Sequence, residues 1–133
     1  MDSSRIIKLD IGGTVFKTSR STLTKYDCMF RAMLDSEIPL ETDESGSIFI
    51  DRDPTHFRYI LNFLRDGNVK LPENQVVVEQ ILAEAQFYLV QGLVEACSKN
   101  QAYYQIIRDE QELQNVLKNT NKFNFELILR LFI

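Results

Sequence analysis

Residues 49–67 read Phe-Ile-Asp-Arg-Asp-Pro-Thr-His-Phe-Arg-Tyr-Ile-Leu-Asn-Phe-Leu-Arg-Asp-Gly, which is a strand end, a charged turn and an amphipathic helix in one stretch. Asp53 is a good N-cap, since its carboxylate can accept from first-turn amides, and Pro54 suits the first helical position. Gly67 supplies the left-handed conformation that ends many helices. We therefore predict a helix that starts at Pro54 and ends at Gly67. Its buried stripe has the i, i+3, i+4, i+7 spacing and consists of Phe57, Ile60, Leu61 and Leu64.

The composition is that of one compact domain with a tail. The 133 residues are 44% hydrophobic and 26% charged, which is ordinary for a soluble globular protein. Fifteen Lys and Arg against 19 Asp and Glu give a net charge of −4, which disfavours nucleic acid and anionic membrane surfaces as partners. No apolar run is long enough for a membrane span, and the start lacks a signal-peptide core. We expect an intracellular protein, cytoplasmic or nuclear.

Two strands are predicted at the start of the chain. Apolar and polar residues alternate over 5–11, as in a strand with one buried face, and a second strand is expected at 15–18. Gly12 and Gly13 tolerate the positive φ angles of a hairpin turn. The lysine and the wider glycine spacing of a phosphate-binding loop are missing, so we favour the hairpin.

Helices are predicted to follow, with one further strand. A short helix is expected at 19–25 and another after Asp27, then an exposed acidic loop at 38–47 and a strand at 47–50. Two later segments have helical spacing, through Val78, Ile81, Leu82, Ala85 and Leu89, and through Val90, Leu93, Val94 and Cys97. This order predicts a mixed α/β fold with a small N-terminal sheet and surrounding α-helices.

The composition changes near Asn100 to polar residues mixed with aromatic and branched ones. We therefore divide the chain into a domain at 5–99 and a C-terminal extension at 100–133. Apolar residues near the end alternate as in a strand, yet Phe123, Leu127 and Leu131 also suit a helix, so periodicity does not decide. The extension is expected to dock on its own domain, to pair with another subunit, or to be the stub of a second domain.

Asp51, Arg52 and Asp53 form the first candidate site. No nucleophile, metal or second base is placed beside them, which argues against acid–base catalysis. An arginine flanked by carboxylates can form bidentate ion pairs within one subunit or across two, and the sequence leaves both possibilities open.

Phe87 forms the second candidate site. At about 100° per residue it lies roughly opposite Val78, and so away from the apolar stripe of its helix. Either a neighbouring helix covers the ring, or the ring is an exposed aromatic anchor for a partner.

No residue is assigned a catalytic, cofactor-binding or metal-binding role. Cys28 and Cys97 lie far apart in the sequence, and His56 is the one imidazole, so neither a disulfide framework nor a zinc site is suggested. His56 itself is assigned no role. We therefore expect two reduced thiols, no cofactor and no enzymatic activity.

Read together, residues 6–98 resemble the BTB/POZ domain of the potassium-channel-tetramerisation-domain (KCTD) family. The motifs are Leu-Asp-Ile-Gly-Gly-Thr-Val-Phe-Lys-Thr-Ser-Arg-Ser-Thr-Leu at 9–23, Phe-Ile-Asp-Arg-Asp-Pro at 49–54, Ile-Leu-Asn-Phe-Leu-Arg-Asp-Gly at 60–67 and Glu-Ala-Gln-Phe-Tyr at 84–88. Two further stretches, 23–27 and 88–97, look like the BACURD subgroup, whose members are adaptors for cullin-3 ubiquitin ligases that target RhoA.

The resemblance implies a ring of four or five subunits that offers a surface to the N-terminal region of cullin-3. Asp51, Arg52 and Asp53 fall where family members carry polar residues of the subunit interface, and Phe87 falls where cullin-binding members carry an aromatic contact. Related BTB proteins are further expected partners, and a Rho-family GTPase is the implied substrate. The alternative is a homo- or hetero-oligomerisation scaffold that binds no cullin.

Two departures from the relatives bear on these expectations. The His and Cys cluster that binds zinc in several channel tetramerisation domains is missing here, as is a membrane span, so a channel subunit is disfavoured. BACURD proteins continue into a sizeable second domain, whereas the sequence has only residues 100–133 after its domain.

Overall fold

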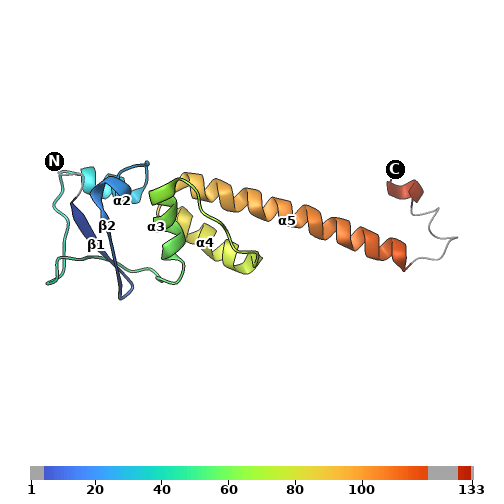
Figure 1. Cartoon of the computed structure of the whole chain (residues 1–133), viewed down its shortest axis with the longest axis horizontal. Helices are drawn as coiled ribbons and strands as arrows, with labels where there is room; N and C mark the ends of the chain where they lie inside the picture. The colour runs from blue at the N-terminus through green and yellow to red at the C-terminus, as the bar shows by residue number, and fades with distance from the viewer. Residues whose placement is uncertain (1–4, 120–128, 133) are drawn as a thin grey trace. The chain divides into compact units, whose positions relative to one another are not determined.

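A computed structural model describes residues 5–119 and 129–132 of the chain (Figure 1). The chain divides into two compact units, Met1–Ser98 and Lys99–Ile133. The first unit contains the sheet and the shorter helices, and it carries both candidate sites.

The sheet has three strands: β1 (Ile6–Ile11), β2 (Thr14–Ser19) and β3 (Ile48–Ile50). Its order is β2-β1-β3, with β1 antiparallel to β2 and parallel to β3. The predicted alternation is confirmed, because one face of β1 is buried through Ile7, Leu9 and Ile11. The hairpin is also confirmed, with φ of 55° at Gly12 and 107° at Gly13.

Residues 5–119 also contain five helices: α1 (Arg20–Leu23), α2 (Met29–Asp35), α3 (Phe57–Asp66), α4 (Gln75–Phe87) and α5 (Gln91–Lys118). Two of them have side-chain caps. The Ser19 hydroxyl accepts from the Thr22 amide at α1, and the Asn74 side chain accepts from the first amides of α4. The predicted mixed α/β class, a small N-terminal sheet with several helices, is confirmed.

The predicted start of α3 is wrong by three residues. The Asp53 carboxylate accepts from the Thr55 amide at 2.8 Å, which closes a local turn instead of capping a helix at Pro54. The Phe57 amide then donates to the Pro54 carbonyl, and the helix begins at Phe57. The predicted end is confirmed, because Gly67 has a φ of 77° and its amide donates to Phe63.

Aromatic rings occupy the centre of the first unit. Tyr88 is fully buried and stacks on Phe30, with ring centroids 5.1 Å apart and planes at 20°. Phe57 meets Tyr88 edge-on at 5.3 Å and lies 4.9 Å from the half-buried Phe16. These contacts tie α2, α3, the sheet and the end of α4 into one core.

The helix α5 runs through residue 100, where the composition changes, without a break. In the second unit it carries exposed apolar side chains, among them Tyr103 and Ile106. The pattern of Phe123, Leu127 and Leu131 fitted either a strand or a helix. Phe123 and Leu127 lie outside the described residues. Leu131 lies in a short helical stretch at 129–132 and is exposed.

Candidate interaction surface

Arg52 lies in the turn between β3 and α3, and its side chain reaches across to α4. Its Nε donates to Glu84 Oε1 at 3.2 Å, and its Nη2 donates to Glu84 Oε2, which makes a bidentate pair within the chain. The Glu84 side chain is only 12% exposed and that of Arg52 is 32% exposed. The hydrogen bond to Glu84 raises the pKa of Arg52, so the guanidinium stays charged.

Phe87 is the last residue of α4, and its side chain is 42% exposed. This exposure rules out full cover by a neighbouring helix, which was one of the two possibilities left by the sequence. The Arg52 guanidinium carbon lies 4.4 Å from the ring centroid, within range of a cation–π interaction. The other neighbour is Tyr88, whose ring meets Phe87 edge-on at 5.0 Å. Phe87 is therefore held in place while much of its ring faces solvent.

Glu84 joins the two candidate sites and was not predicted. It lies three residues before Phe87, hence on the same side of α4, and it is buried although it is an acid. An acidic residue next to the apolar stripe of a helix is the signal that would have found it. We define the clamp as Arg52, Glu84 and Phe87, because Glu84 holds the Arg52 guanidinium and the guanidinium in turn lies over the Phe87 ring.

Asp51 and Asp53 flank Arg52 in the sequence, but both are exposed and neither joins the clamp. Asp53 accepts from the hydroxyl and the amide of Thr55, and these hydrogen bonds lower the pKa of its carboxyl group. The two carboxylates thus face solvent while the arginine between them turns inward. A contact of residues 51–53 with a neighbouring subunit stays a prediction.

Gly12 supports the turn that contains Arg52. Its amide donates to the Ile50 carbonyl at 2.9 Å, and a β-carbon at this position would lie 2.3 Å from the backbone oxygen of Arg52. The hairpin and the turn can pack this closely only because residue 12 has no side chain.

The placement of Leu89 in the apolar stripe of a helix is wrong, because α4 ends at Phe87 and Leu89 lies beyond it. Leu89 is the one described non-glycine residue with a positive φ, at 59°, and its side chain is 63% exposed. Left-handed backbone costs a residue with a β-carbon about 1–2 kcal/mol. Glycine and asparagine are the residues that usually mark such a position, so the leucine gave no signal.

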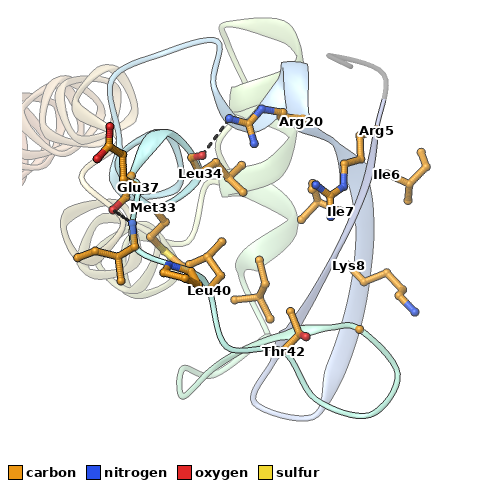
Figure 2. A pocket seen from close by; sticks show the side chains of 15 residues that line it. Arg5, Ile6, Ile7, Lys8, Arg20, Met33, Leu34, Glu37, Leu40 and Thr42 are labelled. Carbon is orange, nitrogen blue, oxygen red and sulfur yellow. Dashed lines mark hydrogen bonds between the residues drawn. The ribbon is translucent and has the colours of Figure 1, made fainter. Parts of the chain in front are cut away.

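A surface hollow of about 460 Å³ lies between β1, α2 and the loop that follows α2 (Figure 2). Arg20 at its edge donates to the Leu34 carbonyl at 2.9 Å and to Asp35 at 3.2 Å, so its charge is already paired. Much of the wall is the exposed loop, including Leu40 and Thr42. We assign the hollow no function.

The described part of the chain has the side chains of His, Cys, Asp and Glu as potential metal ligands, and its thiols are Cys28 and Cys97. It contains no group of three or more of these side chains placed to hold a metal ion. The Nε2 atom of His56 forms a hydrogen bond with Oε1 of Gln80, at 2.8 Å. Cys28 and Cys97 are buried free thiols, and burial raises the pKa of Cys97 to about 11, which keeps it protonated near neutral pH. Within the described ranges, no helix has the length and apolar character to cross a bilayer.

Comparisons with known proteins agree with this architecture. The BTB/POZ domain family matches residues 7–97. The zebrafish (Danio rerio) "BTB/POZ domain-containing adapter for CUL3-mediated RhoA degradation protein 1" is 43% identical over 95 residues, which are 71% of this chain and 29% of the relative. The human protein 2 of the same name is 40% identical over 94 residues, 71% of this chain and 30% of the relative.

The Xenopus tropicalis protein 2 is 40% identical over 105 residues, which are 75% of this chain and 33% of the relative. The chain thus spans about a third or less of the length of these curated relatives. The family match covers more than half of the chain and coincides with the unit that carries the sheet and the clamp. The resemblance drawn from the motifs is confirmed, and this chain belongs to the BTB/POZ domain family.

Proposed function

We propose that this chain is a non-enzymatic adaptor that assembles into a ring and binds the N-terminal region of cullin-3. The observation that carries the proposal is the exposed Phe87 ring, held on the surface by the Arg52 guanidinium 4.4 Å from its centroid. An aromatic side chain fixed in one orientation loses little conformational entropy on binding, and such residues dominate many interfaces. The printed names of the relatives describe adapters for CUL3-mediated degradation.

Self-assembly is supported by the face of the sheet that points away from the core. Ile6, Val15 and Phe49 are exposed, at 64%, 49% and 57%, on the same face as Lys8, Asp10 and Lys17, so this face offers both apolar and charged groups to a neighbour. The exposed carboxylates of Asp51 and Asp53 continue from the end of β3, where they can pair with cations of a neighbour. A ring of four or five subunits would display several copies of Phe87, and weak cullin contacts would then gain from multivalency.

The names of the relatives also suggest a class of substrate. The relatives' names point to RhoA, so a Rho-family GTPase is the substrate class that we propose. Those proteins are about three times as long as the stretch they share with this chain. Related BTB proteins are further candidates for mixed assembly.

The light-scattering mass of the purified chain, alone and with the cullin-3 N-terminal region, tests assembly and partner together. We expect four or five times the chain mass of 15.5 kDa, and a larger mass when cullin is added. An unchanged ring mass with cullin would instead favour the oligomerisation scaffold. A stable monomer would contradict the assembly on which both functions depend.

Phe87→Ala is expected to weaken cullin binding by about 10- to 30-fold, the loss typical of a central aromatic contact. The ring mass should stay the same, because the side chain faces solvent and not the core. Isothermal titration with the cullin-3 N-terminal region measures the loss. Val76→Ala is the matched control, since Val76 is 61% exposed at the opposite end of α4. Equal affinities for the unaltered chain and Phe87→Ala would remove Phe87 from the site.

A further inference from the structure

The backbone of Leu89 is shaped by the turn that ends α4. Its amide donates to the Gln86 carbonyl at 3.2 Å, and the amide of Val90 donates to the Ala85 carbonyl at 2.9 Å. These two bonds form a Schellman closure, in which the residue after the C-cap takes a left-handed conformation. The closure uses only backbone atoms, so glycine at residue 89 would make the same bonds without the clash of a β-carbon.

The side chain of Leu89 contributes little to the packing of the core. It is 63% exposed, whereas its neighbours Tyr88 and Val90 are 0% and 2% exposed. One residue thus combines an unfavourable backbone conformation with an exposed apolar side chain. Strain that the fold does not need points to a role for the side chain in function.

Leu89 lies next to the clamp. Phe87 and Leu89 stand on either side of the buried Tyr88, both exposed, at the point where α4 ends. The closure fixes the backbone of Leu89 and Arg52 holds the Phe87 ring, so binding orders less of the chain here, which favours affinity.

We infer that Leu89 is a second anchor of the cullin-binding surface, which enters an apolar groove of the partner together with Phe87. This inference rests on the proposed function and deepens it. It specifies the kind of partner that fits: a surface with an apolar groove that takes an aromatic ring and a branched aliphatic side chain.

The test replaces Leu89 in the whole chain by glycine and by asparagine. Both residues tolerate left-handed backbone, and asparagine keeps nearly the shape of leucine while it removes the apolar character. Each variant should melt at the same or a higher temperature than the unaltered chain. Each should bind the cullin-3 N-terminal region about 5- to 10-fold more weakly. A purely structural role would not lower affinity while stability is kept.

The outcomes separate the inference from the function on which it rests. If the unaltered chain binds cullin-3 and both variants bind equally well, the inference fails and the proposed function stands. If affinity falls only together with the melting temperature, the leucine is structural and the inference also fails. If the unaltered chain does not bind, the proposed function fails and the inference fails with it.

Discussion

Gly12→Ala is expected to destabilise the domain by about 2–4 kcal/mol, through left-handed strain and overpacking combined. The added β-carbon would lie 2.3 Å from the backbone oxygen of Arg52, at a φ of 55°. Backbone cannot yield as the end of a flexible side chain can, so the hairpin and the turn must move apart. Urea denaturation of the purified chain measures the change in unfolding free energy. Because the displaced turn carries Asp51 and Asp53, the ring mass should fall as well.

Gly46→Ala is the matched control for this prediction. Gly46 also has a positive φ, at 83°, but a β-carbon there would meet only the Lys8 side chain, at an ordinary 3.9 Å. Both variants carry backbone strain, whereas only Gly12→Ala forces a clash with backbone. Equal losses of stability would show that strain alone accounts for the effect and that the close approach at Arg52 is tolerated.

The sequence predicted most of the fold because its signals are local. Alternation along β1 identifies a strand with one buried face, and Gly67 identifies the end of α3. The predicted start of α3 was wrong because an aspartate before a proline is favourable both at a helix N-cap and in a local turn. The Asp53 carboxylate closes the turn with Thr55, and no pattern in the sequence distinguishes the two uses.

The candidate site was predicted only in part. Helical geometry placed Phe87 away from the apolar stripe, and the exposed ring agrees. The partner of Arg52 could not be predicted, because Glu84 lies 32 residues further along the chain and only the tertiary fold brings them together. Leu89 was placed in the apolar stripe of its helix because its spacing fits, and this was wrong because α4 ends at Phe87 and a left-handed backbone is unusual for leucine.

Arg52→Glu is expected to have the second large effect. It places a second carboxylate against Glu84, whose side chain is only 12% exposed, and it removes the cation from the face of Phe87. Breaking a buried pair costs about 3–5 kcal/mol, and the partial exposure of Arg52 reduces this to about 2–3 kcal/mol. We expect a lower melting temperature, a smaller oligomer by sedimentation velocity and weaker cullin binding. Unaltered sedimentation would argue against a role of this turn in assembly.

The charge-swapped double variant, Arg52→Glu with Glu84→Arg, decides how Arg52 acts. It restores an ion pair within the chain but reverses the charge that residue 52 would offer to a neighbouring subunit. We expect stability and ring mass to recover together, because Arg52 already has a bidentate partner in its own chain. The interface would then depend on Asp51 and Asp53, whose carboxylates are exposed. Recovery of stability without recovery of ring mass would instead assign Arg52 itself to the subunit contact, and the clamp and the interface would then share one guanidinium.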